Sequence, residues 1–273
     1  MDTATSPSAA MSDADFQRIQ AFMYRHAGIN LSPAKKALVS GRLQKRLRQR
    51  GLNGYGEYFR LVESGREPAE TQVAVDLLTT NETYFFRELK HFEFLRDKVL
   101  PRLEPGRPCR VWSAACSSGE EPYSIAMLLA DRLGSRPWEV LASDISSRVL
   151  ATARTGHYPM SRGELIPKPY YSRFCLKGVG RQEGTFLVDK TLRARVRFFT
   201  ANLNQALPKL GEFDVIFLRN VMIYFDAATK LEVVRRLTPL LTVGGYLFTG
   251  HSESLHGMDI DLKQVQPAIY QRK

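Results

Sequence analysis

One short segment gathers the side chains that could grip a small charged ligand. Residues 81–87, Asn-Glu-Thr-Tyr-Phe-Phe-Arg, place an amide at Asn81, a hydroxyl at Thr83 and a guanidinium at Arg87 beside three adjacent aromatic rings. An arginine can hold a carboxylate through two parallel hydrogen bonds, which a lysine cannot do in the same planar geometry. The alternative is that the phenylalanines belong to the core and that Arg87 is an ordinary surface charge.

A second candidate site segment follows at residues 111–123, Val-Trp-Ser-Ala-Ala-Cys-Ser-Ser-Gly-Glu-Glu-Pro-Tyr. It reads as a buried strand, a turn of small residues such as Ala114, and the start of a helix. The first strand-to-helix turn of an open parallel sheet faces the place where ligands bind, and small residues let the backbone approach closely. Glu120 and Glu121 stand where a pyrophosphate would otherwise sit. Two carboxylates repel a diphosphate but accept an ammonium or a sulfonium, which favours S-adenosylmethionine over NAD.

Two further strand ends carry candidate nucleoside contacts. The strand predicted over residues 138–143 ends at Asp144, and an acidic residue there accepts hydrogen bonds from ribose hydroxyls. The alternative for Asp144 is the N-cap of the helix that follows. After the third strand, Asn202 and Leu203 could meet the edge and face of an adenine, although Asn202 also suits a simple turn.

The fourth predicted strand, residues 213–218, runs directly into Arg219 and Asn220. Its carboxyl end is expected at the ligand-binding edge of the sheet. Arg219, Asn220 and Tyr224 are therefore candidates for a reaction chamber, in which Tyr224 offers a hydroxyl. The alternative for Tyr224 is a place in the core.

Together these motifs resemble the CheR family of bacterial chemotaxis receptor methyltransferases. The resemblance runs from about residue 13 to about residue 271, and its motifs fall in the same order at residues 81–87, 112–124, 142–145, 219–225 and 250–253. It implies an α/β fold of the class I S-adenosylmethionine-dependent type. That fold is a Rossmann-like sheet with a small all-helical N-terminal domain and a small antiparallel β insertion. The resemblance also implies a cytoplasmic enzyme that methylates glutamate side chains on the signalling helices of chemoreceptors.

On this interpretation the expected catalytic residues are Arg87, which binds the carboxylate of the cofactor, and Tyr224, which orients the substrate. Glu121 binds the amino group of the cofactor and Asp144 its ribose. The remaining cofactor contacts are expected from Asn81, Thr83, Ala114, Ile145, Asn202, Leu203, Arg219 and Asn220. A glutamate side chain is already an anion near neutral pH and needs no general base. His251 is therefore expected to be structural, and no metal is expected.

Composition sets the class of protein. The chain has 273 residues, of which 44% are hydrophobic and 25% charged, as in an ordinary globular protein. No run of eighteen apolar residues occurs, which excludes a membrane-spanning helix. Three cysteines without metal-ligand spacing suit a reducing compartment. Cys116, in the turn of small residues, is expected to be a packing residue and not a nucleophile.

The net charge of +11 is concentrated in one segment. Between Pro33 and Arg50 there are seven basic residues and no acidic one, and Ser32 and Pro33 suit the start of a helix. Leu38, Leu43 and Leu47 are expected to form its apolar stripe. The residues expected to dock an acidic substrate surface are Arg42, Lys45, Arg46 and Arg50. The alternative is a solvated helix face.

Four regions are predicted along the chain. They are a disordered tail over residues 1–12, a helical receptor-docking domain over 13–80, a methyltransferase domain over 81–273, and an antiparallel β subdomain inserted at 157–194. Helices are predicted over 13–27, 33–50, 54–64, 69–79 and 88–100. Strands are predicted over 110–114, 138–143, 195–200, 213–218, 245–249 and 265–271, an alternation with helices typical of a parallel sheet.

The expected partners are the cytoplasmic helices of methyl-accepting chemotaxis receptors. In some members of the resembling family the inserted subdomain binds a peptide at the receptor's C terminus as a tether, and an unspecialised flap is the alternative here. A monomer is expected, with no nucleic-acid partner and no membrane insertion. Two other functions stay open. One is a nucleic-acid methyltransferase, favoured by the basic charge but lacking an Asn/Asp-Pro-Pro-Tyr/Phe element. The other is a non-catalytic adaptor that senses the cofactor.

Overall fold

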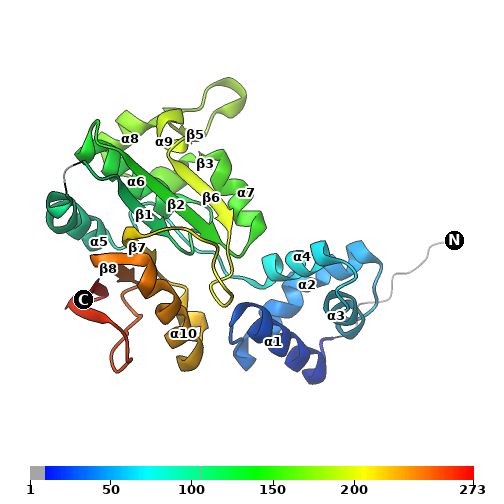
Figure 1. Ribbon diagram of the computed structural model, residues 1–273. Coiled ribbons are helices and arrows are strands. Elements are labelled where there is room, and N and C mark those ends of the chain that lie inside the picture. Colours follow the sequence, from blue (N-terminus) through cyan, green and yellow to red (C-terminus); the bar gives the residue numbers. More distant parts are fainter. Residues whose placement is uncertain (1–9, 105) are drawn as a thin grey trace. The chain divides into compact units, whose positions relative to one another are not determined.

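The computed structural model describes residues 10–104 and 106–273, and the chain divides into two compact units. The helical unit contains the described residues up to Thr80 together with Tyr224–Asp226, and the sheet unit contains Asn81–Ile223 and Ala227–Lys273. Figure 1 shows the elements of both units in sequence colours. Residues 1–9 of the expected tail lie outside the described residues, so the expectation of disorder there stays a prediction.

The helical unit is a small bundle whose turns are set by glycines. Its α-helices are α1 (Asp13–Ala27), α2 (Lys36–Arg50), α3 (Tyr55–Glu63) and α4 (Pro68–Leu78), with a 3₁₀ turn η1 (Pro33–Lys35) before α2. Ser12 caps α1 by accepting a hydrogen bond from the backbone N–H of Asp15 at 3.0 Å. Gly28 and Gly51 follow α1 and α2 in the left-handed conformation that ends many helices.

The sheet unit is built on a mixed sheet. Within residues 10–104 and 106–273 this sheet has seven strands in the order β6-β2-β1-β7-β8-β10-β9. The strands are β1 (Cys109–Ser113), β2 (Trp138–Asp144), β6 (Val196–Thr200), β7 (Phe213–Leu218), β8 (Leu241–Thr249), β9 (Leu262–Gln266) and β10 (Ile269–Arg272). The first five pair in parallel, whereas β10 is antiparallel to both β8 and β9. The order reverses at β1, which has β2 on one side and β7 on the other, and such switch points bind ligands in doubly wound sheets.

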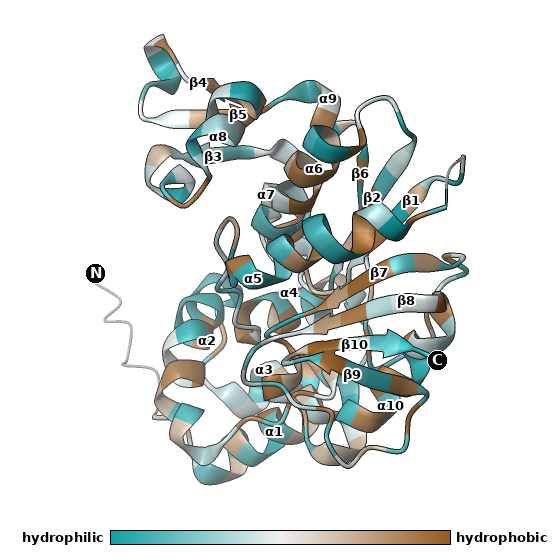
Figure 2. Cartoon of the chain, turned by 90° about the vertical axis from the view of Figure 1, so that its left-hand side faces the viewer, coloured by the Kyte–Doolittle hydropathy of each residue, from teal (hydrophilic) through white to brown (hydrophobic). Residues whose placement is uncertain are grey.

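Helices cover the sheet through apolar contacts. α6 (Glu120–Leu133) packs against β1 and β2, and α7 (Ser147–Thr155) packs against β2 and β6. α5 (Leu89–Phe94) meets the neighbouring strands through its aromatic rings, and α10 (Ala227–Leu237) follows β7 along the chain. Every residue of β7 is buried, and Figure 2 shows this strand mainly in the hydrophobic colour. Among the described residues, no helix combines the length and the apolar character that crossing a bilayer would require.

A second, antiparallel sheet forms the insertion. Its strands, β3 (His157–Pro159), β5 (Thr185–Val188) and β4 (Cys175–Lys177), pair in the order β3-β5-β4. The helices α8 (Lys168–Phe174) and α9 (Lys190–Arg193) belong to the same segment. The predicted architecture is therefore confirmed: a Rossmann-like α/β sheet, a small all-helical N-terminal part and a small antiparallel insertion.

Two element predictions were wrong in detail. The last strand, predicted over 265–271, is the end of a hairpin: β9 and β10 are separated by Pro267, which has no N–H to donate, and by Ala268 with φ +60°. The helix predicted over 88–100 is α-helical only over α5. It continues as a π turn η2 (Leu95–Val99) and a 3₁₀ turn η3 (Leu100–Arg102), where Pro101 interrupts the hydrogen-bond ladder.

Candidate active site

The loop over residues 81–87 divides into a core half and a polar half. Phe85 and Phe86 are buried, and the backbone N–H of Phe86 donates to Ser124 Oγ at 2.9 Å. The two phenylalanines are thus core residues, as the alternative interpretation held. Arg87 is half-buried, and its Nη1 donates to the carbonyl oxygen of Glu82 at 3.0 Å. Its guanidinium also lies over the ring of Tyr84, 5.5 Å from the centroid. The Tyr84 ring and the Glu82 carbonyl therefore hold the Arg87 cation in place on this loop.

The turn after β1 is held from two directions. Ser117, with φ +48°, donates its backbone N–H to Asp144 Oδ2 at 2.8 Å and its hydroxyl to the carbonyl oxygen of Asn81 at 2.8 Å. Gly119 has φ +98°, and a Cβ there would lie 2.8 Å from the Tyr158 hydroxyl, so no other residue fits without a shift. Ala114, next to β1, is buried and donates its N–H to the carbonyl of Phe217. The first predicted loop and this turn therefore meet.

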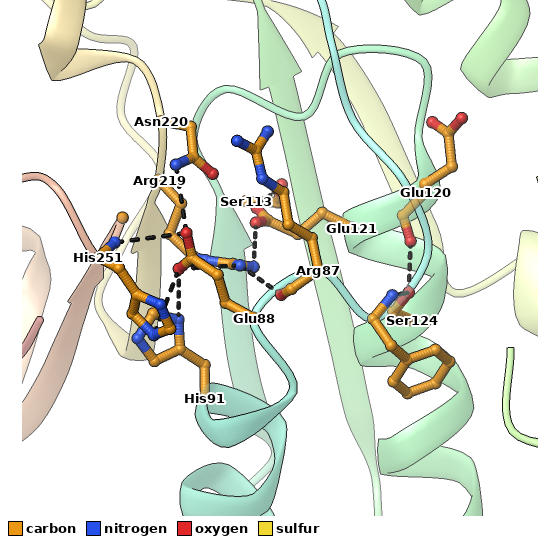
Figure 3. Close-up of polar contacts among 12 residues, drawn as sticks. Arg87, Glu88, His91, Ser113, Glu120, Glu121, Ser124, Arg219, Asn220 and His251 are labelled. Carbon is orange, nitrogen blue, oxygen red and sulfur yellow. Dashed lines mark hydrogen bonds and ion pairs between the residues drawn. The ribbon is translucent and has the colours of Figure 1, made fainter. Parts of the chain in front are cut away.

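The two glutamates that begin α6 point to different places. Glu120 is fully buried and forms an ion pair with Arg162, and it accepts a hydrogen bond from Ser118 Oγ at 2.7 Å. Glu121 instead accepts from Ser113 Oγ at 2.7 Å and from Arg219 Nη1 at 2.8 Å. Figure 3 shows the two carboxyl groups directed away from each other. The expectation of two carboxylates facing a cationic ligand is corrected to one, Glu121.

Arg219 joins the groups of the site. Its side chain is 1% exposed, and its guanidinium donates to Glu121 and to the carbonyl oxygen of Arg87. It also pairs with Glu88, whose Oε2 lies 3.2 Å from Nη2. Burial raises the pKa of the Glu121 carboxyl above its ordinary value, although the charge of Arg219 and the Ser113 hydroxyl act in the opposite direction. Arg219 therefore supports Glu121 and Arg87, the two residues predicted to hold the ends of an amino acid.

Glu88 is a site residue that the sequence interpretation missed. Its Oε1 accepts from Asn220 Nδ2 and from the backbone N–H of His251, each at 3.3 Å, and His91 Nδ1 lies 3.3 Å from its Oε2 (Figure 3). Burial acts to raise the pKa of the Glu88 carboxyl, but Arg219 and these donors outweigh it, so the pKa is lowered. Burial and Arg219 lower the pKa of His91 to about 3. The one available signal was position, since Glu88 directly follows Arg87.

Asn220 is fixed by a second missed residue, Glu253. The buried Glu253 carboxylate accepts the backbone N–H groups of Asn220 and Gly250 at 2.7 Å each and that of Ile223 at 3.1 Å. Three backbone donors hold this carboxylate in place, and Asn220 has the left-handed φ of +56°. Glu253 thus shapes the segment after β7, and the Gly-His-Ser-Glu motif that contains it was the signal available in the sequence.

The predicted nucleoside contacts lie at adjacent strand ends. Asp144 ends β2 and is buried, and its Oδ1 accepts the N–H of Ser146 at 2.9 Å. The N-cap of α7 is Ser146, so the alternative role for Asp144 is wrong. Asn202 and Leu203 follow β6, whose end is tied to β2 by the N–H of Ala201 donating to the Asp144 carbonyl.

The remaining residues predicted to bind the ligands differ in their burial and in their hydrogen bonds. Asn202 Oδ1 accepts from the N–H of Asn204 at 3.0 Å, a local turn bond, and Leu203 is buried. Ile145 and Thr83 are half-buried. Tyr224 is the last residue of η6 (Met222–Tyr224), and its carbonyl accepts the Asn30 N–H at 2.8 Å within the helical unit. The roles of these residues in binding stay predictions.

The basic stripe of α2 is largely engaged inside the helical unit. Arg42 donates to the carbonyl oxygens of Leu78 and Thr79, at 3.1 and 3.0 Å. Arg46 holds Glu70 through two hydrogen bonds, and Arg50 holds Glu67 in the same way. Lys45 and Arg48 are exposed.

The apolar stripe of α2 begins one residue later than predicted. It consists of Val39, Leu43 and Leu47, while Leu38 is exposed. The predicted arginines therefore border the buried face instead of forming a separate solvent-facing line.

A metal-type group also occurs in the site. One ligand atom each from Glu88, His91 and His251 lies within 4.8 Å of the other two, and both ring nitrogens of the buried His91 lack a hydrogen-bond partner. Two imidazoles and a carboxylate can bind a transition metal. However, the Glu88 oxygen nearest the rings is also the one 3.2 Å from Arg219 Nη2, so a divalent cation would meet a fixed positive charge. The charge of Arg219 therefore disfavours a divalent cation at this group.

The residues present fit an S-adenosylmethionine-type ligand by the chemistry of their donors. The half-buried guanidinium of Arg87 suits a carboxylate, the 12% exposed carboxylate of Glu121 suits an ammonium, and the strand-end Asp144 suits ribose hydroxyls. Cys116 is buried and burial raises the pKa of its thiol well above the ordinary value, in keeping with its expected packing role.

Comparisons with known proteins agree over most of the chain. The family model described as "CheR methyltransferase, SAM binding domain" matches residues 81–270, and the model described as "CheR methyltransferase, all-alpha domain" matches residues 14–79. Chemotaxis protein methyltransferase 2 of Pseudomonas aeruginosa is 44% identical over 94% of this chain and 92% of its own length. The chemotaxis protein methyltransferase of Escherichia coli is 45% identical over 92% of this chain and 87% of its own. Among solved structures, the rRNA methyltransferase aviRa of Streptomyces viridochromogenes covers 71% of this chain and 86% of its own, with 14% identity and a TM-score of 0.43, too low to carry an argument.

Proposed function

The chain belongs to the CheR methyltransferase family and has an S-adenosylmethionine-binding methyltransferase domain, and on that premise we propose its substrate and the roles of its residues. It transfers the methyl group of S-adenosylmethionine to glutamate side chains on the cytoplasmic helices of chemotaxis receptors. The products are a glutamate methyl ester and S-adenosylhomocysteine. The observation that carries this proposal is the Glu121 carboxylate, which is 12% exposed and pairs with Arg219 in the same network as Arg87.

The proposed roles follow the donors of the site. Arg87 binds the carboxylate of the methyl donor, Glu121 its amino group and Asp144 its ribose hydroxyls. Ribose hydroxyls can share the Asp144 oxygens with the backbone donors already present, because a carboxylate offers about four lone-pair positions. The other proposed cofactor contacts come from Asn81, Thr83, Ala114, Ile145, Asn202, Leu203 and Asn220. Arg219 acts behind Glu121, and Tyr224 orients the acceptor.

The reaction requires alignment of the glutamate oxygen with the methyl group and does not require a general acid or base. A glutamate oxygen forms a bond to the methyl carbon while the carbon–sulfur bond breaks, and its electron pair stays on sulfur, so no proton moves. An anion and a cation neutralise each other, and a site that excludes water favours that step. Holding two reactants in line can supply about 7 to 11 kcal/mol in the best intramolecular cases. A tight arginine clamp on the acceptor would oppose the reaction by stabilising the carboxylate ground state.

Two partner surfaces belong to this proposal. Lys45, with the neighbouring exposed Arg48, offers cations on α2 that suit an acidic receptor helix. The β4 strand of the insertion pairs on one side with β5; Leu176 within β4 is 55% exposed, and Val179 shortly after β4 is 80% exposed. Such an edge suits an extended peptide, so a receptor tether is proposed there. The enzyme is proposed to act as a cytoplasmic monomer.

The test is methyl transfer itself. The purified protein is incubated with methyl-labelled S-adenosylmethionine and a panel of receptor cytoplasmic fragments, and base-labile label is counted before mass spectrometry assigns the modified residues. We expect ester label on glutamates, and its loss with Arg87→Ala, because the donor's carboxylate then has no partner. A folded Arg87→Ala variant with wild-type affinity for S-adenosylhomocysteine would contradict the assignment of Arg87. Label on an RNA control, or on nothing, would contradict the proposed substrate.

A further inference from the structure

Glu88 adopts a conformation that its side-chain contacts must maintain. It has φ +58°, a region that residues other than glycine rarely occupy. It stands at the N-cap position of α5, yet its side chain makes no capping hydrogen bond. The carboxylate instead pairs with Arg219 and accepts from Asn220 and His251. A strained backbone whose side chain serves another group indicates a role in the site.

The charges around Glu121 do not balance. Counted without the two imidazoles, Glu88 and Glu121 bring two negative charges and Arg219 brings one positive charge. The side chains of both glutamates are 12% exposed, so water screens these charges only weakly. If Arg219 faced Glu121 alone, the pair would be neutral and would attract an ammonium weakly. With Glu88 present, the group keeps one excess negative charge.

Arg219 also links both ends of the predicted amino-acid site. Nη1 donates to Glu121 at 2.8 Å, and Nη2 donates to the carbonyl oxygen of Arg87. The position of this one guanidinium therefore affects the group proposed for the ammonium and the residue proposed for the carboxylate. Glu88 contacts the same guanidinium from a third direction, at 3.2 Å from Nη2 and 3.4 Å from Nε.

We propose that Glu88 is a positioning residue that acts through Arg219 and leaves Glu121 with the excess negative charge that binds the amino group of the methyl donor. The inference rests on the proposed function, because it takes Glu121 and Arg87 to be the amino-acid site. The expected effect is selective: loss of the Glu88 charge weakens the binding of ligands that carry the amino-acid part and leaves the binding of ligands that lack it unchanged.

The experiment compares two probes by titration calorimetry on the full chain. S-adenosylhomocysteine carries the amino acid, whereas 5′-methylthioadenosine has the same nucleoside and a thioether but no amino acid. Glu88→Gln keeps the size of the side chain and an acceptor oxygen while removing the charge. We divide the affinity for S-adenosylhomocysteine by the affinity for 5′-methylthioadenosine. In Glu88→Gln we expect this ratio to fall at least about tenfold, equivalent to about 1.4 kcal/mol. An unchanged ratio in the folded variant would overturn the inference.

Glu88→Asp separates charge from shape. It keeps the negative charge and shortens the side chain by one methylene, so we expect the affinity ratio to stay within about threefold of wild type, or 0.7 kcal/mol. A fall as large as that expected for Glu88→Gln would show that shape decides, and it would overturn the inference. Circular dichroism establishes folding. If Glu88→Gln does not fold, Glu88→Asn, the neutral counterpart of the aspartate variant, replaces it with the same expected fall and the same overturning result.

Glu121→Gln distinguishes this inference from the function beneath it. If wild type does not bind S-adenosylhomocysteine, or if Glu121→Gln and Arg87→Ala leave its affinity unchanged, the proposed cofactor site itself fails. If both of those variants lose affinity and the Glu88 variants keep the wild-type ratio, only the role of Glu88 fails. A fall of the affinity ratio in Glu88→Gln, together with a ratio near the wild-type value in Glu88→Asp, supports both the proposed cofactor site and the role of Glu88.

Discussion

Each unit of the chain contains an arginine–glutamate network around a buried charged side chain, Glu70 in the helical unit and Arg219 in the sheet unit, and the two networks differ in their balance of charge. In the helical unit, the nearly inaccessible Glu70 accepts two hydrogen bonds from Arg46 and one from the Tyr58 hydroxyl at 2.7 Å. Arg50 pairs with Glu67, so two cations meet two anions. In the sheet unit, Arg219 meets both Glu88 and Glu121.

The difference teaches how a structural ion pair is distinguished from one prepared for a ligand. Burial and short hydrogen bonds are common to both networks, so neither property identifies a binding site. A balanced network has no charge left for a ligand, whereas one excess carboxylate in a weakly screened place calls for a cation. The arginines of the α2 stripe hold acceptors of their own unit, and their predicted role in docking a partner stays a prediction.

The largest effect is expected from breaking the unbalanced network at its centre. Arg219→Met leaves Glu88 and Glu121 facing each other without a cation, and breaking a buried pair in this way typically costs about 3 to 5 kcal/mol of stability. Glu121 and Arg87 also lose the guanidinium that positions them, and two neighbouring carboxylates without a cation tend to share a proton, so the negative charge is not retained for the ligand. We therefore expect a lower unfolding temperature and at least a hundredfold loss of affinity for S-adenosylhomocysteine, about 2.7 kcal/mol. Calorimetry on the folded fraction measures the second effect, and wild-type affinity would contradict the role of Arg219.

The matched change in the balanced network should affect stability alone. Arg46→Met leaves the Glu70 carboxylate without its guanidinium, so we expect unfolding in urea to become easier by about 3 kcal/mol. Because a buried pair replaced by apolar residues is often no less stable, Arg46→Met combined with Glu70→Met should recover most of that loss. Affinity for S-adenosylhomocysteine should stay at the wild-type value in both variants. A selective loss of affinity would mean that the helical network also serves the ligand.

Acid should affect the two networks in a fixed order. The pKa of Glu121 is raised above 4.5 by burial, so affinity for the cofactor's ammonium should fall on acidification while the pH is still above 4.5. The pKa of Glu70 is lowered by its hydrogen bonds from Arg46. Its contribution to stability is therefore fully present above the unfolded value of 4.5 and is lost as the pH falls through the lower folded value.

A pH series of calorimetry and thermal unfolding measures this order. Binding should weaken at a pH at which the helical unit keeps its stability, and Glu121→Gln should flatten the dependence of affinity on pH in that range. The opposite order, with the helical unit destabilised first, would contradict the assignment of the two environments.

The smallest effect is expected at the exposed cations of α2. Lys45→Glu reverses a solvent-facing charge, and rim charges alter association rates by amounts that salt reduces. We expect receptor methylation at low salt to slow by about threefold, or 0.7 kcal/mol, with unchanged affinity for S-adenosylhomocysteine. Lys98→Glu, at an exposed lysine of the sheet unit, is the control. Equal slowing in both variants would indicate a general effect of net charge.

The fold was predictable because its signals are local. Buried strands such as β7 are mostly apolar runs, and turns of small residues or glycine mark the ends of strands. The family motifs then identified the order of the elements. The errors were also local. Pro267 and Ala268 divide the strand that was predicted over 265–271, and the apolar stripe of α2 begins at Val39 and not at Leu38.

Several residues of the candidate site could be named from the sequence, but Glu88, Glu253 and the connections between the site residues could not. Glu120 and Glu121 are indistinguishable neighbours in the sequence, and their roles are separated by partners far along the chain, Arg162 for Glu120 and Arg219 for Glu121. The pairing of Arg219 with Glu88 joins segments 131 residues apart. Such contacts depend on tertiary packing, which spacing and residue type do not encode in any short window.

The most direct test of the account is a crystal structure of the protein with S-adenosylhomocysteine. We predict that the ligand's amino group lies within hydrogen-bond distance of the Glu121 carboxylate, about 3 Å, and that its carboxylate lies against the Arg87 guanidinium. Arg219 should keep its pairs with Glu88 and Glu121. An amino-acid end that points away from Glu121, or a ligand bound elsewhere on the sheet unit, would contradict the central claim.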